Sequence, residues 1–175
     1  MKINTISFLF ITFFYSLTSF AQEKLDVFEV ARKGTAQQAL EIIKTDAKAF
    51  NTTNNNGFTP LILACYRGNN EVAKVLIENN CDINAKSEMG TPLMAAIVKG
   101  NNEIAKLLIE KKADINYADI NGTTALIYAV QFQNIEILKL LIENNVNKLH
   151  KDNDGKTAFE HAVFSSNDAI INLLK

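Results

Sequence analysis

The sequence has little of several residue types that mark specialised proteins. It has no tryptophan, two prolines, two cysteines and seven glycines among 175 residues. Two cysteines are too few for a small domain held by several disulfides, and so few glycines and prolines exclude collagen and low-complexity disorder. The sequence also has no large excess of charge of one sign, because its 18 Lys and Arg nearly balance its 19 Asp and Glu. The chain therefore has no general basic surface for nucleic-acid phosphates, and its 47% hydrophobic content can form a buried core.

The N-terminus has the pattern of an export signal. Lys2 precedes an apolar run at 6–20, and the run ends in Ser19-Phe20-Ala21. This order of charge, apolar segment and small residues predicts a signal peptide at 1–21, cleaved after Ala21. The run falls short of the roughly 20 apolar residues that span a bilayer, which argues against a membrane anchor. We expect a bacterial chain, 22–175, without a membrane span, that is periplasmic or secreted.

The rest of the chain repeats with a period of 32 to 33 residues. Threonines at 59, 91, 124 and 157 recur in phase, each just after a glycine. Three further segments, at 69–84, 101–116 and 134–149, are similar to one another. Regular repetition of this length is typical of stacked structural units, each of which buries its apolar face against its neighbours.

Each period predicts two short helices. Thr59 is a suitable N-cap with Pro60 at the first helical position, and Gly68 can end that helix in the left-handed conformation. The second helix has apolar residues at helical spacing, as in Val72, Val75 and Leu76. Asx-Gly turns then lead to the next period.

These motifs resemble the ankyrin repeat: Gly-x-Thr-Pro-Leu, then Ala, then Gly, then a Glu-[Ile/Val]-x-x-[Leu/Val]-Leu-Ile helix, then Ala-Asp-Ile-Asn. The resemblance implies an all-α solenoid of stacked antiparallel helix pairs, joined by β-hairpin-like turns. It places a degenerate first repeat at 22–53, full repeats at 54–86, 87–118 and 119–151, and a truncated last repeat at 152–175. Atypical terminal repeats are what capping of such a stack requires.

The chain also departs from the family pattern. The second full repeat is one residue short around Met89-Gly90, so its hairpin tip should differ from the others. Thr157 and Glu160 have the spacing of a capping box. The histidine of the family's Thr-Pro-Leu-His motif is replaced by Ile62, Met94, Ile127 and Glu160.

Residues that carry catalysis or bind metals are nearly absent from this pattern. His150 and His161 lie at different phases of the repeat, without a partner at metal-ligand spacing. The turn at 150–155 has only a faint likeness to a calcium loop. Cys65 and Cys81 should lie toward opposite ends of a helix pair, which predicts two buried free thiols and no disulfide. We expect no catalytic residues, no metal and no cofactor.

The resemblance also implies where a partner would bind. In ankyrin repeats the hairpin tips and the exposed side of the inner helices form a concave groove, and several variable positions here are apolar or aromatic. The resulting partner-binding candidates are Phe58, Tyr66, Arg67, Met89, Lys99, Ile120, Asn121, Gln131, Phe132, Asp154 and Lys156.

The function expected from these features is a non-catalytic scaffold that binds another protein outside the cytoplasm and is monomeric when unbound. A toxin-neutralising immunity protein and a secreted host-directed effector are alternatives within the binding class. An enzyme is the least favoured alternative, because a groove of mixed apolar and unpaired polar residues has no recognisable catalytic cluster.

Overall fold

A computed structural model describes residues 25–175, so the expected signal peptide lies outside the described residues. Ten α-helices occur in this part of the chain, together with one short 3-10 helix, η1 (Ala49–Asn51). The α-helices are α2 (Val27–Lys33), α3 (Ala36–Thr45), α4 (Pro60–Arg67), α5 (Asn70–Glu78), α6 (Pro92–Lys99), α7 (Asn102–Glu110), α8 (Ala125–Gln131), α9 (Ile135–Glu143), α10 (Ala158–Phe164) and α11 (Asp168–Leu174).

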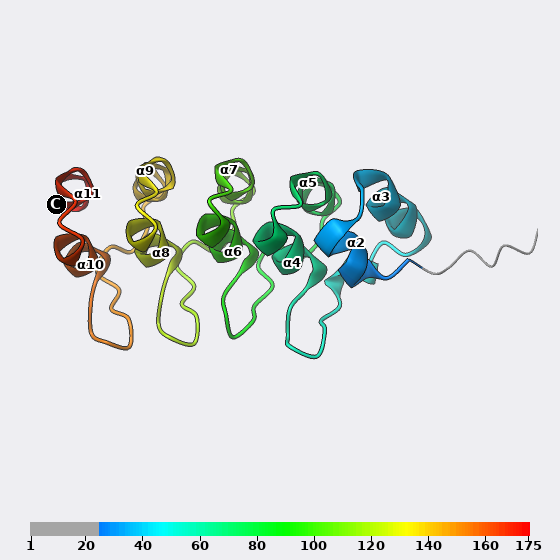
Figure 1. Cartoon of the computed structure of the whole chain (residues 1–175), viewed down its shortest axis with the longest axis horizontal. Helices are drawn as coiled ribbons and strands as arrows, with labels where there is room; N and C mark the ends of the chain where they lie inside the picture. Colours follow the sequence, from blue (N-terminus) through cyan, green and yellow to red (C-terminus); the bar gives the residue numbers. More distant parts are fainter. Residues whose placement is uncertain (1–24) are drawn as a thin grey trace, which may run out of the picture.

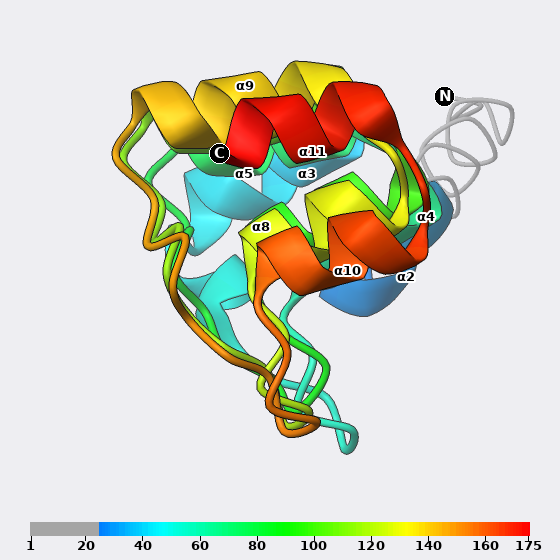
Figure 2. The ribbon, with the colours of Figure 1, turned by 90° about the vertical axis from the view of Figure 1, so that its left-hand side faces the viewer.

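The helices form two parallel rows along the length of the molecule (Figure 1). The inner row is α2, α4, α6, α8 and α10, and each helix packs on the next. The outer row is α3, α5, α7, α9 and α11, and hairpin loops project from the inner row away from it (Figure 2). Within residues 25–175 the only β-pairing is two isolated bridges at hairpin bases. The all-α repeat solenoid expected from the sequence is confirmed.

Helix ends follow the sequence signals. The Thr59 and Thr91 hydroxyls accept hydrogen bonds from amides in the first turns of α4 and α6. Gly68 and Gly100 end the same helices at φ 74° and 72°, a conformation that costs glycine little. At α10, the Thr157 amide donates to Glu160 Oε2 at 2.6 Å, which completes the expected capping box.

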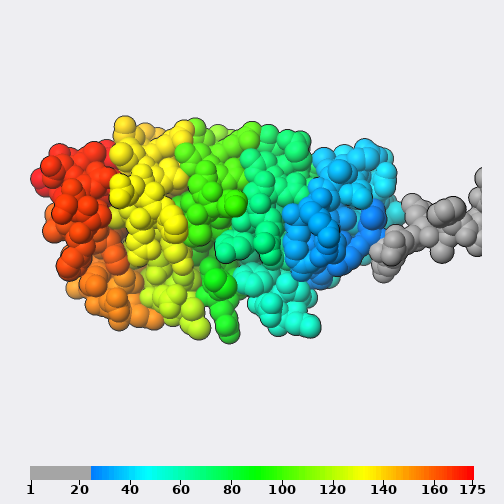
Figure 3. Space-filling view, viewed as in Figure 1, coloured from blue at the N-terminus to red at the C-terminus, as the bar shows by residue number. Residues whose placement is uncertain are grey.

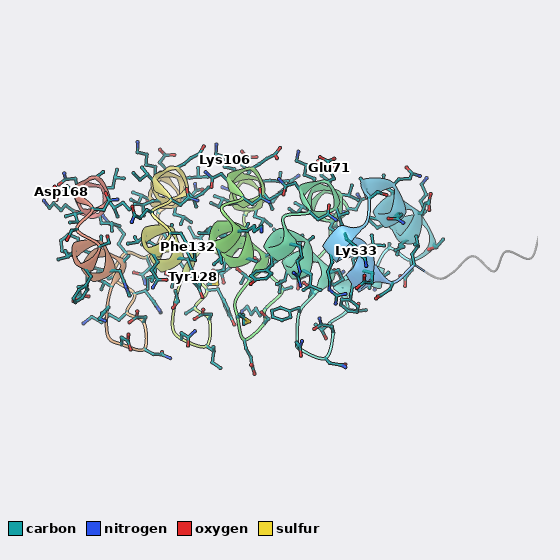
Figure 4. All side chains as sticks on the ribbon, in the orientation of Figure 1. Lys33, Glu71, Lys106, Tyr128, Phe132 and Asp168 are labelled. Carbon is teal, nitrogen blue, oxygen red and sulfur yellow. The ribbon has the colours of Figure 1, made fainter. Side chains whose placement is uncertain are left out.

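The core lies between the two rows of helices. Each outer helix turns an apolar stripe toward the inner row, while its charged face stays in solvent. Val72 and Leu76 of α5 and Leu108 of α7 are fully buried, as their spacing predicted. Figure 4 shows the opposite, solvated edge, where Glu71 and Lys106 project from the outer row. Within residues 25–175, every helix is too short or too polar to cross a bilayer.

Three of the four hairpin tips share one construction. The side-chain oxygen of the first turn residue accepts two amide hydrogen bonds, as Asp119 does from Asn121 and Thr123, both at 2.9 Å. Asn54 and Asp152 begin two other tips in the same way.

The tip at 87–90 differs, as its missing residue predicted. There the Ser87 hydroxyl donates to the Gly90 carbonyl at 2.9 Å, and Gly90 has φ 106°. This φ favours glycine, and a Cβ added at Gly90 would lie 2.4 Å from the Met94 sulfur, so that any other residue would also have to displace the Met94 side chain.

Neighbouring tips are linked along part of the stack. The Ile120 amide donates to the Glu88 carbonyl at 3.1 Å, and the Asn153 amide donates to the Asn121 carbonyl at 3.0 Å. In the described part of the chain, no hydrogen bond joins the tip at 54–58 to the shorter tip at 87–90. The lower edge of the molecule is notched between these two tips (Figure 3).

The last repeat contains a histidine–carboxylate pair. His161 Nε2 lies 2.6 Å from Asp152 Oδ2, and the Asp152 side chain is only 8% exposed. Burial alone would raise the pKa of Asp152. Hydrogen bonds from the Lys156 amide, His161 and the Asp154 amide outweigh burial and hold that pKa below its usual value. The contact between Asp152 and His161 joins the base of the last hairpin to α10.

The stability of the last repeat should therefore depend on pH and fall in acid. Because the folded-state pKa of Asp152 is depressed, its stabilising effect is present above the unfolded pKa of about 4 and is lost as pH falls through the folded pKa. Amide exchange of α10 in the full chain, measured between pH 7 and 3, should show this loss below about pH 4. Asp152→Asn should make α10 open more readily at pH 7 and flatten the acid dependence. An unchanged acid dependence in the variant would assign it to other carboxylates.

Both cysteines are buried free thiols. Cys65 in α4 is fully buried, and Cys81, after α5, is 5% exposed. Burial disfavours the thiolate and raises the pKa of Cys65 to about 12 and that of Cys81 to about 11.

The two cysteines of the folded chain should thus resist alkylation by iodoacetamide at pH 8, where less than about one thiol in a thousand is ionised. Mass spectrometry after native alkylation should find both cysteines unmodified, and both labelled after denaturation. Fast labelling of Cys65 in the folded chain would contradict this burial.

Candidate partner-binding surface

One hollow of the surface lies where the inner helices meet the first two hairpin tips. Its volume is about 450 Å³, within the range of small-molecule pockets. We call it the inner hollow. It is lined by Arg32, Asn54, Asn56, Phe58, Ile62, Leu63, Tyr66, Arg67, Met89, Met94, Ala95, Val98, Tyr128 and Phe132.

Apolar side chains around the inner hollow are left open to solvent. Tyr66 is 49% exposed, Met89 66% and Phe132 52%. Phe58 is half-buried and packs against the core, so it forms part of the floor. Repeat packing alone would cover such groups, and large apolar patches left on a soluble protein mark interaction sites.

An aromatic pair at α8 forms one wall of the inner hollow. The rings of Tyr128 and Phe132 lie 6.3 Å apart, and both project from the inner row (Figure 4). The Tyr128 hydroxyl donates to Asp119 Oδ2 at 2.6 Å. Burial, together with this carboxylate, raises the pKa of Tyr128, so the phenol stays neutral. The bond anchors Tyr128 to its own hairpin, so the wall is preformed before any partner arrives.

The charges at the inner hollow are of one sign. Arg32 and Arg67 are the charged residues among those that line it, and no Asp or Glu is included. Arg32 forms an ion pair with Glu29 of its own helix. No ion pair involves Arg67 within residues 25–175. The site is therefore apolar with a cationic margin.

A second, wider hollow of about 980 Å³ runs along the hairpin tips. Phe58 and Met89 border it as well as the inner hollow, and Ile120 is 62% exposed within it. The Lys86 ammonium lies 4.8 Å from the centre of the Tyr117 ring, a cation–π contact across neighbouring repeats. We call this surface the tip hollow. The two hollows adjoin, since they share Asn56, Phe58 and Met89, but the tip hollow is the more polar of the two, with Glu88 and Asp119 in its lining.

The structure gathers some of the expected binding residues and separates others. Phe58, Tyr66, Arg67, Met89 and Phe132 line the inner hollow, and Ile120 lines the tip hollow. Lys99 lies beside them, because its side chain covers Gly68 next to Arg67. The expected residues that line neither hollow are Lys99, Asn121, Gln131, Asp154 and Lys156.

Lys156 is engaged within its own repeat instead. Its ammonium lies 3.8 Å from the Asp154 carboxylate and 5.1 Å from the centre of the Phe164 ring. Sequence reasoning missed several residues that line the inner hollow, among them Arg32, Met94 and Tyr128. Met94 occupies the position of the family's missing histidine, which could have indicated it. Arg32 belongs to the degenerate first repeat, where the register of the motif is weak.

The surface offers little for catalysis. Among residues 25–175, no three His, Cys, Asp or Glu side chains lie close enough together to hold a metal ion. His161 is paired with Asp152. His150 Nε2 lies 2.9 Å from the Gly122 carbonyl, a contact that links neighbouring hairpins. Neither histidine lines the inner hollow. The arrangement can bury an apolar side chain and attract an anion.

Comparison with known proteins gives a consistent result. A family model for ankyrin repeats, built on three copies, matches residues 27–119 and 116–175. Similarity also extends to the zebrafish (Danio rerio) ankyrin repeat and SAM domain-containing protein 6, at 33% identity over 63 residues. That match covers 36% of this chain and 8% of the zebrafish protein, so the chain spans a small part of its relative. Ankyrin repeats are general protein–protein interaction modules and are typically non-catalytic.

Proposed function

We propose that this chain, which belongs to the ankyrin-repeat family, is a non-catalytic scaffold that binds another protein in the inner hollow. The observation that carries the proposal is the convergence of Tyr66, Met89 and Phe132 from three repeats on one open, apolar hollow. A stack that served only its own stability would bury these side chains or replace them with polar ones.

The shape of the surface supports a protein as the ligand. The inner and tip hollows together extend over three hairpin tips, which is more than a small metabolite would need. An ordinary protein interface buries about 1,200–2,000 Å² in total, and its binding energy is concentrated in a few Tyr, Trp and Arg residues. Tyr66 and Arg67, adjacent at the end of α4, fit that composition.

The location of this function is proposed from the sequence. Removal of 1–21 as a signal peptide would leave a chain that works in the periplasm or outside a bacterial cell. We further propose that the unbound chain is monomeric, with the inner hollow open until the partner occupies it. The partner's own cell of origin would distinguish a housekeeping scaffold from an immunity protein or a host-directed effector.

Site-specific photo-cross-linking of the full chain in its producing cells tests the proposal. One variant carries a photoreactive amino acid at Val98, which lines the inner hollow. The matched control carries it at Lys139, an exposed position on outer helix α9. We expect one defined protein adduct, identified by mass spectrometry, from Val98 and none from Lys139. The same adduct from Lys139 alone, or none from Val98, would refute the assignment of the binding surface.

A further inference from the structure

The inner row carries a line of cations whose position is fixed by the repeat. Lys33, Arg67 and Lys99 are the last residues of α2, α4 and α6, so they occupy equivalent positions in three successive repeats. Because inner helices pack side by side, these positions follow one another along the inner row, and Arg67 lines the inner hollow. The fourth inner helix, α8, is followed by Phe132, and the cationic line stops there.

Part of this line is neutralised within the chain. The Lys33 ammonium lies 2.8 Å from Glu29, and Arg32 bonds to the same carboxylate. Arg67 and Lys99 form no ion pair among residues 25–175. The C-terminal end of a helix favours a cation modestly, which accounts for the residue type but supplies no counter-charge.

Two cations of the outer row are paired with a carboxylate of the next repeat. On the outer row, Lys74 of α5 lies 2.6 Å from Glu103 of α7, and Lys106 of α7 forms an ion pair with Glu136 of α9. Glu103 and Glu136 consequently have pKa values below their usual range, with the lysine hydrogen bond as the largest cause in each. Within the described residues, Arg67 and Lys99 have no such partner, as is also true of exposed lysines such as Lys139, but they differ from it in lying at the inner hollow.

Arg67 and Lys99 lie at the inner hollow, whose lining has no carboxylate, whereas Glu88 and Asp119 line the adjoining tip hollow. Arg67 lines the inner hollow, and the Lys99 side chain rests over Gly68 at the hollow's margin. A partner that fills the hollow removes water from this margin, which strengthens attraction to an anion and penalises a cation or an unpaired charge. Arginine is also the side chain that best binds a carboxylate with two parallel hydrogen bonds.

We propose that the partner segment that enters the inner hollow is acidic and aromatic: a large apolar side chain fills the hollow, and a neighbouring Asp or Glu pairs with Arg67 and Lys99. This inference rests on the proposed function, because it names the chemistry of the partner at that same surface. The hollow's volume of about 450 Å³ leaves room for one large side chain and part of its backbone. Phe58 and Phe132 both line the hollow and supply aromatic contacts.

Selection from a displayed library of random twelve-residue peptides on the full chain tests the inference. The selection is run in parallel on the wild type, on Arg67→Glu with Lys99→Glu, and on Lys44→Glu with Lys139→Glu. The last variant changes net charge equally, but at exposed outer-row positions in α3 and α9. Thermal melts of all three chains establish that each is folded.

The wild type and the outer-row variant should enrich peptides in which Asp or Glu lies within a few positions of Phe, Tyr or Leu. The Arg67→Glu, Lys99→Glu chain should enrich Lys or Arg in their place. An acidic peptide selected on the wild type should bind the inner-row variant about tenfold more weakly, and the outer-row variant within about twofold. Raising the salt concentration from about 0.05 to 0.5 M should weaken its binding to the wild type several-fold.

Other results would separate this inference from the function on which it rests. Enriched peptides that lose binding with Tyr66→Ala but show no acidic preference would overturn the charge inference and leave the protein-binding surface standing. Peptides whose binding is unaffected by Tyr66→Ala, Arg67→Glu and Lys99→Glu would overturn both. A selection that enriches nothing would also overturn the inference, because an extended acidic segment would then not be a sufficient ligand.

Discussion

Replacing Phe58, Tyr66 and Phe132 together with alanine should abolish capture of the partner protein while the helical content of the chain stays the same. Phe58 and Tyr66 come from one repeat and Phe132 from another, and all three line the inner hollow, so one variant removes most of its aromatic surface. Interface residues of this kind cost about 2 kcal/mol or more each when truncated. Even with incomplete additivity, affinity should fall by a factor of more than about a thousand.

Pull-down of the partner with full-length wild-type and variant chains measures this loss, and circular dichroism measures the helical content. Phe58 is half-buried, so its truncation lowers stability as well, and thermal melts must show that the variant remains folded. The matched control replaces Leu149, Phe159 and Phe164, which are exposed apolar residues of the last two repeats outside both hollows. Capture should survive in the control. Equal capture by both variants would place the binding surface elsewhere.

Replacing Leu108 with alanine should lower the free energy of unfolding by about 2–5 kcal/mol. Leu108 is fully buried in α7, which packs against α5, α6 and α9. Its truncation leaves a cavity bordered by three helices that cannot all move inward together. In a stack stabilised by contacts between neighbouring repeats, weakening the central repeat also uncouples the repeats on either side.

Urea unfolding followed by circular dichroism provides the measurement. The wild type should unfold in one transition, and Leu108→Ala should shift its midpoint downward or split it into two. The matched control is Glu110→Ala on the same helix, whose exposed side chain should change stability by no more than about 0.5 kcal/mol. A loss below about 1 kcal/mol for Leu108→Ala would mean that the interior tolerates this cavity and that α7 is not a central element of the core.

The helices and their ends could be predicted because their signals are local. The Thr59 cap, the left-handed Gly68 and the capping box at Thr157 each depend on residues within one turn. The threonine cap recurs at α6, α8 and α10, and the left-handed glycine recurs at α6. The buried stripe of α7 likewise follows from helical periodicity alone. Repetition strengthens the prediction of the helices, since similar units stack by similar contacts.

The inner hollow could be predicted only in part, because it depends on how tips from different repeats approach one another. The missing residue near Met89 predicted an unusual tip, but not that this tip would lack a hydrogen bond to the tip at 54–58. Tyr128 reads as a core position in its own repeat, yet its bond to Asp119 holds it at the hollow's wall. Lys156 was expected to face a partner, but Asp154 and Phe164 occupy it locally.

Hydrogen–deuterium exchange of the full chain, with and without its captured partner, tests most directly whether the partner occupies the inner hollow. The account predicts slower exchange at the tips 54–58 and 87–90 and at the adjoining ends of α4, α6 and α8. The outer helices α5, α7 and α9 should exchange as they do in the free chain. Protection confined to the outer row, with the two tips unchanged, would contradict the account.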